Sequence, residues 1–377
     1  MRLTIPQPSL ADVVKWTAAA LPGNPLYPVM MTLRFEARDG QLLVSAWDGE
    51  TALHATVDAD VQEEGASLLP GKFLSGVVSA VRKSDVTIEA GRGRGVLTAP
   101  GVRVDIRPSD AGQWPDMPTA PAVAGAVDGP AFVEAYARIK AASVQANDRE
   151  SNALSSVGSV RLLASDGVLR LATTDRFRVG LEEVAWTPSS ELGDALAVMP
   201  TRAVEQVRPF ADGQLTLALP VDGAGTAGLS GQGREVVTKL SIPKSFPNVE
   251  RAVPESFKIS AYVDAPELVA AIRTVAMVNT KIFRPVWLRF AGESLTVAAS
   301  DLDSAEVRIG ARLEGGVSEF EIPFRASYLN DGLDQVAGTA RIGFNGPRQQ
   351  ALIQSVEDGS YRYIVLPIGD VNAASAG

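Results

Sequence analysis

The chain has 377 residues, of which 46% are hydrophobic, and this is enough apolar material for the cores of two or three domains. It contains no cysteine and a single histidine, His54, which excludes disulfides, thiolate metal sites, cysteine nucleophiles and any histidine-based triad except one at His54. The net charge of −9 argues against indiscriminate nucleic-acid binding, although it leaves room for one basic face.

The N-terminal segment gives no sign of export. The first residues, MRLTIPQPSL, have no apolar core region behind a basic start, as a signal peptide would, and no run of about 18 apolar residues occurs. We therefore expect a soluble, cytoplasmic protein with no membrane partner. We expect neither a cofactor nor a metal ion, and we expect His54 to be a packed or solvent-facing side chain.

Three segments carry nearly the same pattern. Residues 33–48 read LRFEARDGQLLVSAWD, residues 160–175 read VRLLASDGVLRLATTD, and residues 288–301 read LRFAGESLTVAASD. Each has an alternating apolar run, a tight turn and a second alternating run that ends on an aspartate, which predicts a β-hairpin. These aspartates recur at roughly 125-residue intervals, the size of an independent domain, so we expect three similar domains with the aspartates in equivalent structural positions.

Each repeat opens with apolar residues at helical spacing, and a second helix follows the hairpin after a proline. The predicted helices cover 8–20, 70–83, 130–146, 200–210, 266–281 and 323–336. Strands are predicted to close the units, for example at 86–90, 95–99 and 102–107, and at 340–344, 351–355 and 361–366. This order predicts an α+β fold of three tandem similar domains, each with two helices and antiparallel sheets. Pro/Ala/Gly-rich linkers place the domains at 1–120, 121–250 and 251–377.

Charge is distributed unevenly between the predicted helices and the rest of the chain. The helices together carry a net positive charge, whereas the remainder is strongly acidic. A basic helical layer on an acidic body suits a protein that holds a polyanion with its helices. The basic residues on or beside the helices are Lys72, Arg82, Lys83, Arg138, Lys140, Arg202, Arg208, Arg273, Lys281 and Arg284.

The repeat and three local strings together resemble the bacterial sliding clamp family, the β subunit of DNA polymerase III. The strings are ATTDRFRVGL at 172–181, FPNVERAVP at 246–254 and YRYIVLPI at 361–368, and the resemblance covers the whole chain. It implies a DNA clamp fold in which two head-to-tail subunits form a ring around duplex DNA. It also implies a non-catalytic processivity factor that binds DNA polymerase and clamp-loader subunits through clamp-binding peptides.

The resemblance also implies a peptide site between the second and third domains, with aliphatic walls and arginines at its rim. Its residues would be Val157, Thr174, Arg178, Val179, Pro247, Arg251, Ala252, Ile364, Val365, Leu366, Pro367 and Ile368.

Three positions depart from the family pattern: Asn24 replaces a frequent basic residue, Ala252 replaces a larger aliphatic one, and Asp370 lies in a polar tail. Ala252 and the altered tail keep open a divergent extra clamp with a specialised role, such as tolerance of a clamp-directed inhibitor. An enzyme built on a triplicated scaffold is a third hypothesis. It would need a catalytic cluster, and the sequence offers no histidine pair, no cysteine and no nucleotide-binding loop.

Overall fold

The computed structural model describes residues 1–23, 27–91, 93–109, 112, 114–143, 158–189, 194–279, 284–300 and 303–369. Contacts gather the chain into two compact units. The first unit comprises Met1–Pro130 and Thr187–Leu240, and the second comprises Ala131–Trp186 and Ser241–Gly377. The division into three domains at 1–120, 121–250 and 251–377 stays a prediction.

The described residues of the first unit form two antiparallel sheets, with strand orders β5-β1-β7-β8-β9 and β14-β10-β16-β17-β18-β4-β3-β2-β6. Its helices are α1 (Gln7–Ala18), α2 (Gly71–Ala80) and α4 (Thr201–Glu205). The strand bounds are β1 Arg2–Pro6, β2 Thr32–Arg38, β3 Gln41–Trp47, β4 Thr51–Asp58, β5 Asp60–Glu63, β6 Gly65–Pro70, β7 Asp85–Gly91, β8 Arg94–Ala99, β9 Val102–Ile106, β10 Gly125–Asp128, β14 Thr187–Pro188, β15 Ala195–Pro200, β16 Gln214–Ala218, β17 Thr226–Gly231 and β18 Arg234–Lys239.

The second unit contains a sheet of order β11-β12-β13-β27-β26-β25-β19-β23 and a smaller one of order β22-β21-β20-β24. Its helices are α3 (Gly129–Ile139, whose first two residues count with the first unit), α5 (Ala265–Ala276) and α6 (Ala326–Leu333). The strand bounds are β11 Ser159–Ser165, β12 Val168–Thr174, β13 Arg178–Ala185, β19 Ile259–Asp264, β20 Pro285–Ala291, β21 Ser294–Ser300, β22 Ser304–Gly310, β23 Arg312–Glu314, β24 Glu319–Arg325, β25 Thr339–Phe344, β26 Ala351–Ser355 and β27 Arg362–Val365.

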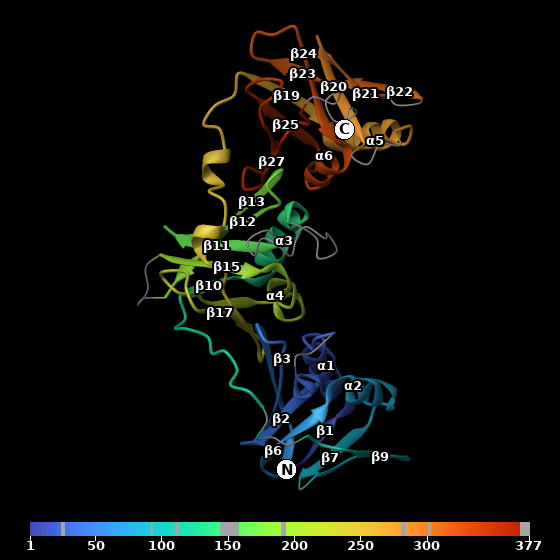
Figure 1. Cartoon of the computed structure of the whole chain (residues 1–377), viewed down its shortest axis with the longest axis vertical. Helices are drawn as coiled ribbons and strands as arrows, with labels where there is room; N and C mark the ends of the chain where they lie inside the picture. The colour runs from blue at the N-terminus through green and yellow to red at the C-terminus, as the bar shows by residue number, and fades with distance from the viewer. Residues whose placement is uncertain are drawn as a thin grey trace. The chain divides into compact units, whose positions relative to one another are not determined.

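Helices and antiparallel sheets in both units confirm the α+β prediction. Within the first unit α1 packs against α2, and within the second α5 packs against α6 (Figure 1). The predicted apolar stripes are the buried ones. On α5, for example, Leu268, Ala271, Ile272 and Val275 are at most 3% exposed.

The hairpins at β2/β3, β11/β12 and β20/β21 confirm the repeated pattern. The first two turn through residue pairs with positive φ, Asp39 (51°) with Gly40 (74°) and Asp166 (52°) with Gly167 (73°), as two-residue hairpin turns require. Residues 48 and 175 also play equivalent roles, because each carboxylate accepts hydrogen bonds from backbone N–H groups two and three residues later. Asp301 lies outside the described residues.

Five helix predictions need correction, and three of them, at 70–83, 130–146 and 266–281, only run past the observed ends at Ala80, Ile139 and Ala276. The predicted 323–336 helix begins only at Ala326, because Pro323 belongs to β24, an edge strand in which a residue without an N–H is tolerated. The predicted 200–210 helix ends at Glu205, and a 3₁₀ turn over Arg208–Phe210 follows. Pro209 explains this ending, since proline cannot continue the hydrogen-bonding pattern of an α-helix.

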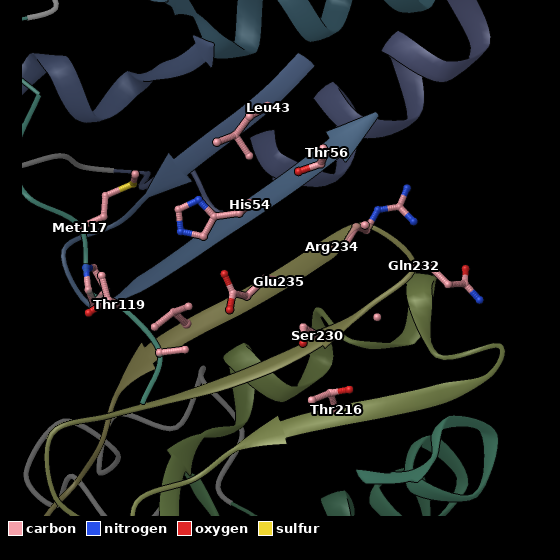
Figure 2. Close-up of a pocket in the computed structure, with 15 residues that line it drawn as sticks. Leu43, His54, Thr56, Met117, Thr119, Thr216, Ser230, Gln232, Arg234 and Glu235 are labelled. Atoms are coloured by element: carbon pink, nitrogen blue, oxygen red, sulfur yellow. The ribbon is translucent and has the colours of Figure 1, made fainter. Parts of the chain in front are cut away.

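His54 lies on β4 and is half-buried (Figure 2). Its Nδ1 atom is 2.9 Å from the Ser45 hydroxyl. Burial, with a smaller effect from the Arg34 charge, lowers its pKa below 6.5. Within the described ranges no three His, Cys, Asp or Glu side chains gather into a group that could hold a metal ion. The helices in those ranges are all too short or too polar to cross a membrane.

Candidate functional site

The second unit brings together two of the three family-like strings. β13 begins at Arg178, within ATTDRFRVGL, and β27 lies within YRYIVLPI. The two strands pair in the register Arg178↔Val365 and Val179↔Ile364. Just beyond the pairing, the Leu366 N–H donates to the Phe177 carbonyl at 2.9 Å. We call this surface, made by residues 174–179 and 364–368, the strand junction.

The linker string lies along the same unit. Glu250 forms an ion pair with Arg161 of β11, and the Arg161 guanidinium lies 5.6 Å from the centre of the Phe246 ring. Farther along, the Gln350 side chain donates to the Ala252 carbonyl, and Gln350 directly precedes β26, the neighbour of β27. These contacts fasten the linker to the sheet that carries the strand junction.

At the strand junction, a turn presents two side chains outward. The Asp175 carboxylate accepts hydrogen bonds from the Phe177 and Arg178 N–H groups, each at 3.0 Å, and the Thr174 hydroxyl accepts one from the Arg176 N–H. Arg176 has a φ of 78°, an unusual value for a residue other than glycine. The turn leaves Arg176 exposed and the Phe177 ring 57% exposed.

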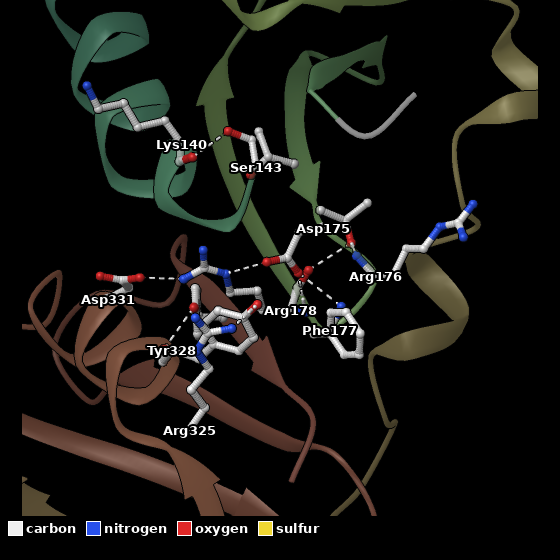
Figure 3. A network of polar contacts seen from close by, with 12 residues as sticks. Lys140, Ser143, Asp175, Arg176, Phe177, Arg178, Arg325, Tyr328 and Asp331 are labelled. Carbon is white, nitrogen blue, oxygen red and sulfur yellow. Dashed lines mark hydrogen bonds and ion pairs between the residues drawn. The ribbon is translucent and has the colours of Figure 1, made fainter. Parts of the chain in front are cut away.

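Beneath this turn lies a charged network (Figure 3). The Arg178 guanidinium donates to Asp175 at 2.8 Å and to Asp331, and it lies 4.1 Å from the centre of the Tyr328 ring. Burial alone would lower the pKa of Arg178, but the charges of Tyr363 and Asp175 and hydrogen bonds to both aspartates raise it overall. Arg325 covers the same Tyr328 ring at 4.4 Å. The network thus joins the β12/β13 turn to α6.

This arrangement corrects the expected role of Arg178. We expected its side chain at the rim of the peptide site, but it is only 8% exposed and is neutralised by two carboxylates. It therefore supports the turn from below. Arg176 and Arg251 are the exposed arginines of this region.

The remaining predicted site residues divide by exposure. Thr174, Val179, Ile364 and Val365 are at most 8% exposed and build the sheet itself. Leu366 is 41% exposed, and Pro247, Ala252, Pro367 and Ile368 are half-buried. Val157 and Asp370 lie outside the described residues, as does Asn24. The assignment of these residues to a peptide site stays a prediction.

Sequence reasoning missed Asp175, Arg176 and Phe177 of the strand junction, and Tyr328 and Asp331 of the network beneath it. Phe177 could have been noticed, because an aromatic residue two positions after a turn aspartate interrupts the apolar alternation. Tyr328 and Asp331 lie on α6, far along the chain from the turn that they contact, and no local pattern predicts them.

The predicted DNA-facing residues differ in their surroundings. Lys72, Arg82, Lys83, Lys140, Arg208 and Arg284 are exposed. Arg202 pairs with Glu50 and Asp48, and Arg273 pairs with Asp334 at 2.9 Å. Arg138 has a side chain only 17% exposed, held by Asp358 at 2.7 Å and Glu182 at 3.3 Å. Because these ion pairs neutralise the Arg138 charge within the second unit, Arg138 is the least suited of the predicted residues to contact DNA. Lys281 lies outside the described residues.

Comparison with known proteins identifies the family. The model for the N-terminal domain of the DNA polymerase III beta subunit matches residues 1–118, and the model for its C-terminal domain matches residues 250–369, together more than half of the chain. The beta sliding clamp of Streptomyces coelicolor is 28% identical, over 98% of this chain and 99% of its own length. The beta sliding clamp homolog GriR of Streptomyces muensis is 26% identical, over 98% and 99%.

The fold agrees with this assignment. The Pseudomonas aeruginosa sliding clamp in its griselimycin-bound structure superposes with a TM-score of 0.88, at 20% identity, over 98% of this chain and 99% of that one. The architecture is therefore the DNA clamp fold. On the family models, the relatives and the fold together, the chain belongs to the DNA polymerase III beta subunit family, the beta sliding clamps.

Proposed function

We propose that two copies of this chain close head to tail into a ring that encircles duplex DNA and keeps a DNA polymerase at its template. The observation that carries the ring is the complementarity of two edge strands. β9 ends one sheet of the first unit, and β22 ends one sheet of the second. An edge strand presents unpaired backbone groups that can pair with another chain, so β9 of one copy can extend the sheet that ends at β22 of the other.

The side chains of these edges select one antiparallel register. If Asp105 faces Arg308, then Arg107 faces Glu306, and both pairs have opposite charges. In the same register Val104 meets Ile309 and Ile106 meets Val307, which gives a continuous apolar row on the other face. A shift of two residues in one direction would oppose Arg103 to Arg308, and in the other direction Arg107 to Arg308. Like charges disfavour both.

DNA binding in this proposal depends on the exposed basic residues of the helical layer. Lys72 lies on α2, and Arg82 and Lys83 follow the helix after Val81, all three exposed. Contacts from such residues to phosphates carry no sequence information and can be exchanged as the ring slides. Lys140, Arg202, Arg208, Arg273, Lys281 and Arg284 extend the proposed DNA-facing surface.

Partner binding is proposed at the strand junction. Phe177 and Leu366 are large apolar side chains with about half of their surface exposed, and the hydrogen bond between their backbones holds them together. An extended peptide with leucine and phenylalanine anchors would cover them, while Arg176 and Arg251 meet its polar groups. We propose that DNA polymerase and clamp-loader subunits bind through such peptides.

The protein acts in this proposal without catalysis, as a tether in the cytoplasm. Its effect is the high effective concentration of a polymerase attached to a ring that cannot leave the DNA sideways. The three proposed domains, 1–120, 121–250 and 251–377, would give six similar domains around the closed ring of two copies.

Sedimentation equilibrium tests the proposed dimer and its register. We expect a dimer at micromolar concentration. Arg308→Asp and Asp105→Arg should each weaken dimerisation about three- to tenfold, because each places like charges opposite one another, and the double variant should restore it. A wild-type protein that stays monomeric at micromolar concentration contradicts the ring. If both substitutions leave the strength of dimerisation unchanged, the proposed register is wrong but the dimer is not contradicted.

A specialised extra clamp is compatible with the likeness to a beta sliding clamp homolog, but no feature of the described residues favours it over the replicative clamp. Both alternatives predict the same ring.

A further inference from the structure

A cavity of about 670 Å³ lies on the larger sheet of the first unit (Figure 2). Its floor comes from β3, β4, β16, β17 and β18, and residues 117–120 form a wall. The cavity is on the sheet face opposite α1. Along β4, Leu53 and Ala55 are fully buried on the side against which α1 packs, whereas His54 and Thr56 alternate with them and line the cavity.

The wall and the rim are held in place. The Thr226 hydroxyl donates to the Thr119 carbonyl at 2.7 Å, and a Cβ atom at Gly228 would lie only 2.7 Å from that of Ala120, so the segment lies close against β17. At the rim, the Thr56 N–H donates to the Gly233 carbonyl at 2.7 Å. A cavity with fixed walls and this volume falls in the range of sites for small ligands.

The cavity floor carries a polar row across the sheet. Strand register sets Ser45 beside His54, His54 beside Glu235, Glu235 beside Ser230, and Ser230 beside Thr216. Adjacent members of such a row point to the same face. Hydroxyl groups therefore flank the Glu235 carboxylate on one side and the imidazole flanks it on the other.

The charge of Glu235 is poorly compensated. Arg234 also lines the cavity, but its guanidinium points to the other face, where it pairs with Asp12, donates to the Pro209 carbonyl and covers Trp16. Arg34, farther along the row, forms an ion pair with Glu36 at 2.9 Å. Burial raises the pKa of Glu235 and lowers that of His54, which favours the neutral imidazole near pH 7.

We propose that this cavity binds a ligand with a basic nitrogen on an aliphatic stem, an ammonium or a guanidinium group. The nitrogen would pair with Glu235 and donate its other hydrogens to Ser230 and Thr216, while Leu43 and Met117 contact the stem. A half-buried carboxylate beside hydroxyl acceptors is the arrangement that such a group needs for its charge and its donors. Because α1 covers the opposite face of the sheet, the ligand and DNA would not compete.

His54 offers a direct readout, because it is the only histidine in the chain and gives one imidazole signal in the NMR spectrum of histidine-labelled protein. The probes are N-acetylarginine amide, which represents a protein side chain, and spermidine, which represents a free polyamine. N-acetylcitrulline amide is the neutral control of matched shape. We expect a saturable shift of the signal with at least one cationic probe and at least tenfold weaker binding of the citrulline compound.

Glu235→Gln should weaken binding of the cationic probe at least tenfold, and Ser230→Ala should weaken it about threefold. Glu205→Gln, an exposed glutamate on α4, is the matched control and should bind as the wild type does. A shift with arginine alone assigns the site to a protein side chain, and a shift with spermidine alone assigns it to a polyamine. No saturable shift with either probe overturns the proposal, as does equal binding of the citrulline compound or unchanged binding by Glu235→Gln. Retention on DNA should not change in these variants.

Discussion

The Leu366→Ala substitution tests peptide binding at the strand junction separately from folding stability. Leu366 is 41% exposed, so a peptide that covers it would remove further apolar surface from water. Full burial of a leucine stabilises by about 1.5–3 kcal/mol, so the exposed part corresponds to about 0.6–1.2 kcal/mol. Alanine keeps the Cβ atom, and we therefore expect binding to weaken by about 0.5–1 kcal/mol, or two- to fivefold in Kd.

The assay is fluorescence anisotropy with a labelled peptide that carries leucine and phenylalanine anchors, and a scrambled peptide serves as the negative control. Val356→Ala removes an aliphatic side chain that is 54% exposed in the same unit but outside the strand junction, and its affinity should equal that of the wild type. The reasoning is wrong if Leu366→Ala binds as tightly as the wild type, or if the wild type does not distinguish the two peptides.

Substitutions deeper in the sheet should behave differently. Ile364 is 2% exposed, and truncation to alanine should reduce the free energy of unfolding by about 2–5 kcal/mol. Val179, at 8% exposure, is likewise a core residue, so Val179→Asp would place a charge in the sheet and report on folding. Urea unfolding of each variant distinguishes these effects from weaker peptide binding.

Two further predictions concern charge. Reversal of the exposed Lys72, Arg82 and Lys83 to glutamate should shorten the retention of the protein on circular DNA, with little change in urea unfolding. The salt slope of binding should fall by about 1 for each phosphate that the protein no longer neutralises. Unchanged retention would remove α2 from the DNA-facing surface. The lowered pKa of His54 favours the neutral ring in the folded protein, so its contribution to the free energy of unfolding should be complete above pH 6.5 and be lost as the pH falls through the lowered pKa. His54→Asn should flatten this pH dependence in urea titrations. An equal pH dependence in both proteins would contradict the lowered pKa of His54.

The parts of the fold that the sequence predicts are those with local causes. The hairpins carry their turns in two residues such as Asp39 and Gly40, and the helices carry their apolar stripes at short spacing. Two of the helix errors also have local causes, since Pro323 suits an edge strand as well as a helix start and Pro209 ends the predicted 200–210 helix early.

The candidate site is less predictable because it depends on pairing between distant segments. Arg178 reads as a surface arginine in its own string, and its burial depends on Asp331 and Tyr328 of α6 as well as on the nearby Asp175. Val179 and Ile364 become core residues only because β13 pairs with β27. Likewise, no local pattern predicts that His54 and Glu235 are neighbours on adjacent strands.

Retention on circular DNA tests the ring most directly. The protein is placed on a nicked circular plasmid by a bacterial clamp loader, and the complex is isolated by gel filtration before and after a restriction enzyme cuts the plasmid once. A closed ring that slides without sequence preference should elute with the circle and separate from the linear product, since it escapes over the ends. Protein that stays with the linear DNA, or that never elutes with the circle, would contradict encirclement.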